Sequence, residues 1–208
     1  MNTFSFLLPV RVDNKDRYNN LNTSLKFLES NFPDSEILLV EDAPSKKCDE
    51  LKNYYSIHYY FRKNQENFSR SDNINFGLLK STRPFFVVWD VDCLIKPEQL
   101  HRTHRLLTDE KAHIILPHNE IFVNIKGKLK EQVSSTLQLN HVPYFKSVPR
   151  NSNHPNIEIY PIPSGIVVFK RDTLIRIGGF NKKMISYGWE DIEVLKRAKK
   201  LGVYYFNL

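Results

Sequence analysis

The stretch that decides the fold is Phe85-Phe86-Val87-Val88-Trp89-Asp90-Val91-Asp92. Its unbroken apolar run predicts a central strand of a parallel sheet, because such strands are covered on both faces. The run ends abruptly in acids, and side chains at i and i+2 of an extended chain point the same way. Asp90 and Asp92 are therefore expected to aim two carboxylates into one site, with Val91 packed behind them. Open α/β sheets bind ligands at this end of their strands.

Strands and helices alternate before this run. Apolar stretches bounded by turn-forming residues predict strands at Phe4–Val10 and at residues 36–40 and 57–61. Helical spacing marks two amphipathic segments, the first by Leu21, Leu25 and Leu28 and the second by Ile74 and Leu78. The second helix is expected to begin at a Ser69 or Ser71 cap. This order predicts an α/β fold with a mostly parallel, Rossmann-like sheet.

The alternation continues after the acids, with one interruption. Pro97 opens a helix that places Leu100 and Leu107 on one side. Residues 126–163 are polar and contain several prolines, so we assign them no regular element, only an ordered loop. The last expected elements are a strand at 166–169, a helix at 172–177, a turn at Gly178-Gly179-Phe180, a helix at 191–201 and a strand at 203–206. We expect one domain over residues 1–208, with halves 1–95 and 96–208.

The composition is that of an ordinary globular protein. Of 208 residues, 41% are hydrophobic and 25% charged. The only early apolar run, Phe4–Val10, is too short to span a bilayer and lacks the charged segment of a signal peptide. Cys48 and Cys93 make a weak disulfide framework. We therefore expect a cytoplasmic protein, with the inner face of the membrane as an alternative location.

The charge leaves several partners open. A formal net charge of +7 suits a polyanion, a membrane surface or a phosphorylated ligand. The basic residues are spread along the sequence, however, as on a solvated surface. The sequence lacks paired Cys/His zinc spacing and an RNP-like aromatic strand, which argues against nucleic-acid binding.

Asp90 and Asp92 have two interpretations. Carboxylate oxygens are hard ligands for Mg²⁺ or Mn²⁺, and a bound diphosphate would complete the shell of the metal. A lone Asp-x-Asp is common, and one of the two residues would otherwise serve in a turn or cap. His101, His104 and His113 also suggest a metal, but the first two fall within the helix behind the acids, and we expect structural roles for all three.

A second acidic feature is Ser186-Tyr187-Gly188-Trp189-Glu190-Asp191, just before an expected helix. Acids at a helix start are stabilised by the helix dipole, and this alone explains their presence. The aromatic residues directly before them favour a sugar pocket, because aromatic faces pack on sugar rings while carboxylates bind hydroxyls.

Together these features resemble the nucleotide-diphospho-sugar glycosyltransferases of the GT-A fold, and most of all an inverting group that includes β-1,4-galactosyltransferases, chondroitin polymerases and bacterial relatives. The resemblance covers essentially the whole chain. It rests on Leu8-Pro9-Val10-Arg11, Val40-Glu41-Asp42-Ala43-Pro44-Ser45, the segment 68–77, Asp90-Val91-Asp92-Cys93, and Gly178-Gly179-Phe180 through Glu190-Asp191.

Two features depart from the family pattern. Ser186-Tyr187-Gly188 replaces the more usual Gly-Trp-Gly, which leaves the acceptor preference open. The family pattern also implies a metal-binding His downstream of Asp191, whereas the last of the seven histidines is His154. The expectation is an incomplete metal shell or a truncated chain.

The resemblance implies an inverting transfer from a UDP-sugar to a hydroxyl of a glycan or polysaccharide, with Mn²⁺ or Mg²⁺ as cofactor. Asp92 would bind the metal directly, with Asp90 as the second metal residue or as a ribose contact. Asp191 would be the general base and Glu190 would bind hydroxyls. The donor-binding residues would be Pro9, Arg11, Glu41, Asp42, Arg70, Asn75, Asp90 and Trp189.

More specific roles follow within that donor set. Glu41 and Asp42 would meet the uracil, and Trp189 would wall the sugar site. Arg11 and Arg70 would bind the diphosphate, because a planar guanidinium matches phosphate oxygens. The alternative for both arginines is a surface ion pair.

Two other functions fit many of these features. A sugar-1-phosphate nucleotidyltransferase also uses carboxylates and Mg²⁺, but it should carry a glycine-rich phosphate loop, and residues 7–18 contain no glycine. A nucleotide-sugar or glycan-binding module of the same fold would bind nucleotide without releasing diphosphate.

Overall fold

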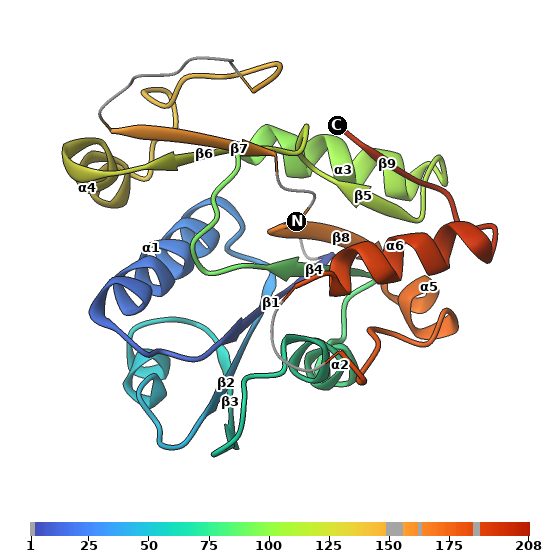
Figure 1. Cartoon of the computed structure of the whole chain (residues 1–208), viewed down its shortest axis with the longest axis horizontal. Coiled ribbons are helices and arrows are strands. Elements are labelled where there is room, and N and C mark those ends of the chain that lie inside the picture. Colours follow the sequence, from blue (N-terminus) through green and yellow to red (C-terminus); the bar gives the residue numbers. More distant parts are fainter. Residues whose placement is uncertain (1–2, 149–155, 162–163, 185–187) are drawn as a thin grey trace.

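The computed structural model describes residues 3–148, 156–161, 164–184 and 188–208. Its centre is a seven-stranded sheet in the order β3-β2-β1-β4-β8-β5-β9, with helices on both faces (Figure 1). The strands are β1 (Phe4–Val10), β2 (Glu36–Ala43), β3 (His58–Lys63), β4 (Phe85–Trp89), β5 (Ile114–Leu116), β6 (Ile121–Ile125), β7 (Ile157–Pro161), β8 (Ile166–Lys170) and β9 (Tyr205–Asn207). The helices are α1 (Lys15–Asn31), α2 (Arg70–Lys80), α3 (Pro97–Thr108), α4 (Gly127–Thr136), α5 (Arg171–Arg176) and α6 (Glu190–Lys200), with a 3₁₀ helix η1 (Asp49–Asn53).

The expected α/β fold and mostly parallel sheet are confirmed. Strands β1 to β4 pair in parallel, as do β5 and β9. The exception is β8, which runs antiparallel between β4 and β5. Because β1 to β4 are parallel, their carboxyl ends meet at one edge of the sheet.

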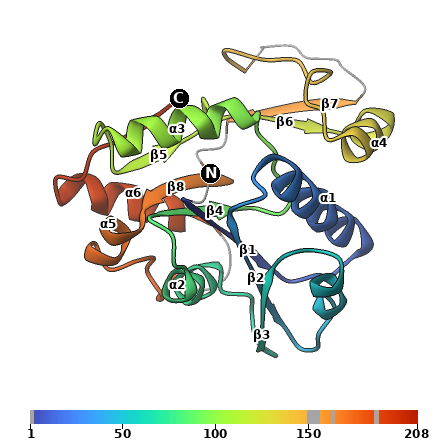
Figure 2. The same cartoon turned by 180° about the vertical axis from the view of Figure 1, so that it is seen from behind.

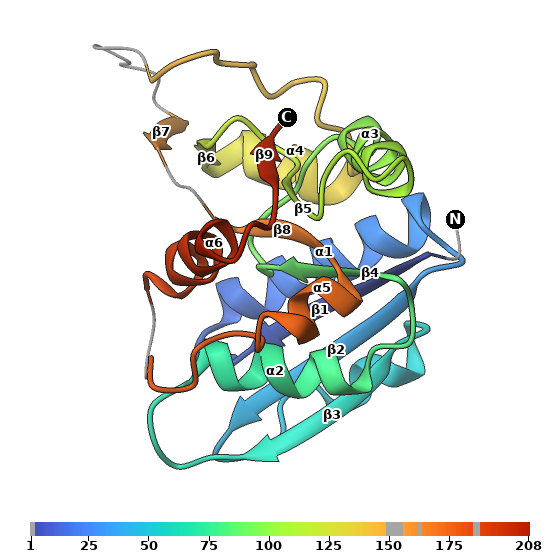
Figure 3. The ribbon, with the colours of Figure 1, turned by 90° about the vertical axis from the view of Figure 1, so that its right-hand side faces the viewer.

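Two separate cores cover the two faces of the sheet. Alternate residues of β1 divide between them, since Phe6 packs with α1 and α3 while Leu7 packs with α2, α5 and α6. The two helix layers lie on opposite sides of the strands in Figure 3. Helix α2 approaches β1 closely, because a Cβ added at Gly77 would lie 2.4 Å from Cδ1 of Leu7. This close approach packs the second half of α2 against the middle of β1.

The segment 126–163 differs from the expected loop. It contains α4 and β7, and β7 pairs antiparallel with β6 in a separate two-stranded sheet. This ribbon and α4 lie beside the main sheet, at the top of the view in Figure 2. Only Val133 is buried in α4, and β7 is half exposed, so neither element carries a strong hydrophobic pattern. Pro149, Pro155 and Pro163 lie outside the described residues.

Both cysteines are free and buried, as the weak disulfide pattern suggested. In the described part of the chain, no helix is long and apolar enough to cross a membrane.

Candidate functional site

The acids after β4 lie in a turn. Strand β4 ends at Trp89, and the Asp90 amide donates to the Gly165 carbonyl at 2.8 Å. The Cys93 amide then donates back to the Asp90 carbonyl at 3.0 Å, which closes the turn. The expected extended geometry is therefore wrong, because the backbone turns before Asp92. The Asp90 side chain is partly buried, while Asp92 is exposed.

Arg70, in the first turn of α2, connects this turn with the second acidic feature. Its Nε and Nη2 donate to one oxygen of Asp90 at 3.1 and 2.9 Å. Its Nη1 lies 2.9 Å from both carboxylate oxygens of Asp191 and 3.1 Å from Glu190. The Arg70 side chain is only 3% exposed. The two acidic features, 100 residues apart in sequence, thus share one buried cation.

A cavity of about 240 Å³ lies over this cluster. Its lining residues are Arg70, Asp90, Ser164, Gly188, Trp189, Glu190, Asp191 and Ile192. Trp189 stands at the rim with 74% of its surface exposed, in a left-handed backbone conformation with φ +67°. Glu190 is oriented by a bond from the Gly188 amide at 2.8 Å. Ser186 and Tyr187, which belong to the same motif, lie outside the described residues.

The cluster has an excess of negative charge, since three carboxylates surround one guanidinium. Burial raises the pKa of Asp90 to about 6, and the neighbouring carboxylates add to this rise against the opposing effect of Arg70. Such a site favours a further cation.

The turn Gly178-Gly179-Phe180 holds α6 in place. Asn75 of α2 donates to the Phe180 carbonyl and accepts from the Phe180 amide, both at 2.8 Å. From the other side, Arg197 of α6 donates to the Gly179 carbonyl at 2.6 Å and to the Ile177 carbonyl. The Asn75 amide is therefore placed at this turn, and Asn75 does not line the cavity.

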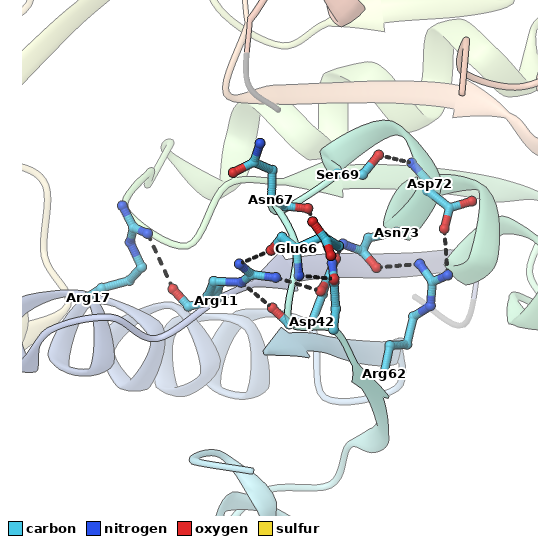
Figure 4. A network of polar contacts seen from close by, with 10 residues as sticks. Arg11, Arg17, Asp42, Arg62, Glu66, Asn67, Ser69, Asp72 and Asn73 are labelled. Atoms are coloured by element: carbon cyan, nitrogen blue, oxygen red, sulfur yellow. Dashed lines mark hydrogen bonds and ion pairs between the residues drawn. The ribbon is translucent and has the colours of Figure 1, made fainter. Parts of the chain in front are cut away.

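A second polar network lies at the ends of β1 and β2 (Figure 4). Arg11 binds the Asp42 carboxylate at 2.9 Å and the Asp42 carbonyl at 2.7 Å. The other Asp42 oxygen accepts from Asn73 of α2 at 2.6 Å, and Arg62 donates to Asn73. Arg11 is thus held by a buried internal partner, Asp42, as well as by the Glu66 carbonyl.

Glu41, next to Asp42, is fully buried. Its oxygens accept bonds from the amides of Lys47 and Cys48 and from the Tyr59 hydroxyl. Burial, followed by the bond to the Glu41 carboxylate, raises the pKa of Tyr59 above its usual range. Glu41 therefore supports the loop after β2 from inside. Pro9 is buried beside it in β1, paired with Val40.

Several site residues were not found from the sequence. Ser164 and Ile192 line the cavity, and Asn73 links Asp42 to α2. Gly188 also lines the cavity, and it belongs to the second acidic feature that the sequence had already indicated. Gly165, directly before β8, is the sequence feature that could have indicated a site at Ser164. A Cβ there would lie 2.4 Å from Phe122, so the backbone beside the Asp90 turn requires glycine.

The described residues do not by themselves enclose a metal ion. In the described ranges, no three His, Cys, Asp or Glu side chains are grouped to enclose an ion. His101 and His104 pack against Phe32 and Phe4, and His113 stacks on Tyr204, which agrees with structural roles. Asp92 and Asp90 offer the oxygen ligands that Mg²⁺ and Mn²⁺ accept together with substrate phosphates.

A larger hollow of about 480 Å³ opens beside η1 and β3. Its lining residues are Lys46, Asp49, Lys52, Ile57, Tyr59 and Phe61. None of the acids of the cluster reaches it, and we assign it no chemistry.

The family of the chain follows from its sequence as a whole. A model described as "Glycosyltransferase like family 2" matches residues 5–208. The chain belongs to this family. The expected family membership is therefore confirmed, and the match includes both acidic motifs. A comparison with curated protein sequences finds no significant match.

Solved structures of low identity share the fold of this family 2 chain. The catalytic domain of Drosophila β1,4-galactosyltransferase 7, in complex with xylobiose, is 13% identical with a TM-score of 0.59, over 100% of this chain and 65% of that one. A mutant of it was solved with manganese, UDP-Gal and xylobiose. The Pyrobaculum calidifontis mannosyltransferase PcManGT, in complex with GDP-Man and Mn²⁺, is 13% identical with a TM-score of 0.61, over 99% of this chain and 54% of that one.

A synthetase of low identity shares the fold as well. CMP:2-keto-3-deoxy-manno-octonic acid synthetase, complexed with CTP, is 12% identical with a TM-score of 0.55, over 100% of this chain and 90% of that one. At such identities the likeness shows the fold alone, and the family match distinguishes the two classes. The chain spans about two thirds or less of the two glycosyltransferases compared.

Proposed function

We propose that this chain catalyses an inverting, metal-dependent transfer of a sugar from a UDP-sugar to a hydroxyl of a glycan or polysaccharide. One observation carries the proposal: a single cavity brings Asp90 of the first acidic motif together with Glu190 and Asp191 of the second, under an exposed Trp189. The sugar donor and the acceptor hydroxyl would meet between these carboxylates. The family of the chain supports a sugar transfer.

The donor side is the carboxyl edge of β1, β2 and β4. Arg11 is the more exposed member of its ion pair there, and the buried Asp42, Pro9 and Glu41 support it from behind. The nucleotide would lie across this edge, as ligands of open α/β sheets do. The Drosophila neighbour binds UDP-Gal and the Pyrobaculum neighbour GDP-Man, which supports a nucleotide-sugar donor. The choice of UDP rests on the resemblance in sequence.

Asp92, with Asp90 behind it, would hold Mn²⁺ or Mg²⁺. The Asp92 side chain is exposed, and its Oδ1 accepts a bond from the Cys93 thiol. A cation bound by this carboxylate would in turn bind the donor phosphates. When bound, the ion would neutralise the diphosphate as it leaves. Manganese in both glycosyltransferase neighbours supports this assignment.

Asp191 is the proposed base. Each of its oxygens accepts one bond from Arg70, and a carboxylate oxygen has a further lone pair for an acceptor hydroxyl. Asp191 would take the hydroxyl proton while the acceptor oxygen bonds to the sugar carbon and the bond from that carbon to the diphosphate breaks. Glu190 would bind sugar hydroxyls, and Trp189 would pack against a sugar ring.

Product analysis distinguishes the rivals. Incubation with a panel of nucleotide sugars and Mn²⁺ should release free nucleoside diphosphate, most with a UDP-sugar and a glycan acceptor. Release of pyrophosphate from UTP and a sugar 1-phosphate would instead identify a nucleotidyltransferase. Nucleotide binding without either product would identify a binding module.

A further inference from the structure

Almost all N–H groups of the Arg70 guanidinium donate hydrogen bonds within the protein. A guanidinium has five N–H groups. The bonds to Asp90, Glu190 and Asp191 use Nε, both positions on Nη1 and one on Nη2. A diphosphate ligand needs at least two free N–H groups directed into the cavity for a bidentate contact. Arg70 does not offer them in this arrangement.

The same bonds join three separate parts of the chain. Arg70 begins α2, Asp90 follows β4, and Glu190 and Asp191 begin α6. Asn75, further along α2, fixes the turn that precedes α6. Helix α2 thus presents two side chains that determine where the acids of the second motif lie.

The electrostatics point the same way. Without Arg70, three carboxylates would lie close together in a buried place, and their mutual repulsion would drive them apart. With Arg70, Asp191 is held through both oxygens, so its direction as well as its position is fixed. A general base needs a fixed position and direction, because a small displacement of a reacting group lowers the reaction rate strongly.

We propose that Arg70 is a positioning residue for the transfer reaction, which holds Asp191 and Asp90 in their working places and does not bind the donor diphosphate. This inference rests on the proposed function of the cavity. It replaces the sequence-based expectation for Arg70 with a role inside the protein.

Arg70→Lys tests the inference, because lysine keeps the charge but lacks the planar fork that reaches three carboxylates. We expect the variant to fold and to bind UDP in the presence of a chelator within about threefold of the wild type, since no diphosphate contact is lost. The transfer rate at saturating donor should fall by roughly 10². Arg171→Lys is the matched control, because Arg171 pairs with Asp172 and Ser81 at the opposite end of β4 and should change neither quantity.

Arg70→Ala gives a second test through chemical rescue. Added guanidinium should occupy the vacated place and restore part of the transfer rate, without changing UDP affinity. Circular dichroism and thermal unfolding report whether each variant is folded.

Loss of metal-free UDP affinity in Arg70→Lys, with uridine binding unchanged, would overturn the inference and make Arg70 a diphosphate ligand. A normal transfer rate in Arg70→Lys would also overturn it, and so would failure of both variants to fold, since the role would then be stability alone. A wild-type protein without transfer activity on any nucleotide sugar contradicts the proposed function itself, and this result is distinct from all of these.

Discussion

Both carboxylate oxygens of Asp191 lie 2.9 Å from Nη1 of Arg70, although 121 positions separate the two residues in sequence. This contact brings the start of α6 to the start of α2, beside the turn that contains Asp90. The acids of the two motifs are therefore held together by contacts within the protein. Preorganised charged groups of this kind avoid rearrangement during the reaction.

The turn before α6 is a point where one extra carbon should disturb the site. Gly179 has φ +66°, and a Cβ there would lie 2.4 Å from Oδ1 of Asn75. Gly179→Ala should lower the free energy of unfolding by roughly 2 to 4 kcal/mol, from backbone strain and lost Asn75 bonds. Denaturant unfolding measures the change.

Gly202→Ala is the control for Gly179→Ala. Gly202 has a similar φ of +73°, but a Cβ there would meet nothing within 4 Å. Gly202→Ala should lower the free energy of unfolding by about 1 to 2 kcal/mol, from backbone strain alone. Equal losses at both positions would mean that the contact with Asn75 is unimportant.

Asp92→Asn should weaken donor binding through the metal. A neutral amide oxygen replaces a charged ligand at an exposed position, so metal-dependent UDP affinity should fall roughly tenfold or more. Calorimetry with Mn²⁺ and with a chelator measures this, with ion concentrations up to the millimolar range. Stability should remain within about 0.5 kcal/mol, because the side chain is exposed. Unchanged UDP affinity in the presence of Mn²⁺ would count against Asp92 as a ligand.

Trp189→Ala should affect substrate use without affecting the fold. Loss of an aromatic face at the cavity rim should lower kcat/KM by roughly tenfold. Tyr204→Ala is a matched control, because Tyr204 is 73% exposed but lies outside the cavity. The melting temperature should stay nearly constant in both variants. A fall in kcat/KM of the same size in Tyr204→Ala would show that the effect is not specific to the cavity.

The sequence predicted most of the central sheet, because its strands are apolar and its helices carry regular stripes. Leu21, Leu25 and Leu28 are all buried on α1, as their spacing indicated. The pattern failed at α4, β6 and β7, where one face is largely exposed and hydrophobic periodicity is weak. The antiparallel direction of β8 could not be read either, since an apolar run does not reveal its orientation.

The sequence motifs identified the residues of the site, but they did not reveal the contacts between those residues. Asp90 and Asp191 were identified. Asp90 and Asp92 do not share a strand face as predicted, because the strand ends at Trp89. Arg70 binds Asp191 and Asn75 binds Phe180, and each pair is more than 100 positions apart in sequence. Only the folded chain reveals these contacts. Sequence alone could not separate a ligand-binding arginine from a buried internal one.

The most direct test of the proposed function is the rate of a single round of transfer by Asp191→Asn, with UDP-sugar affinity measured in parallel. The substitution keeps the size of the side chain and an oxygen for Arg70, but removes the group that accepts the proton. We predict that donor affinity stays nearly unchanged while the rate falls by roughly 10² to 10⁴, the usual contribution of a positioned base. A near-normal rate, or a loss of rate and donor affinity together, would contradict the assignment of Asp191 as the general base.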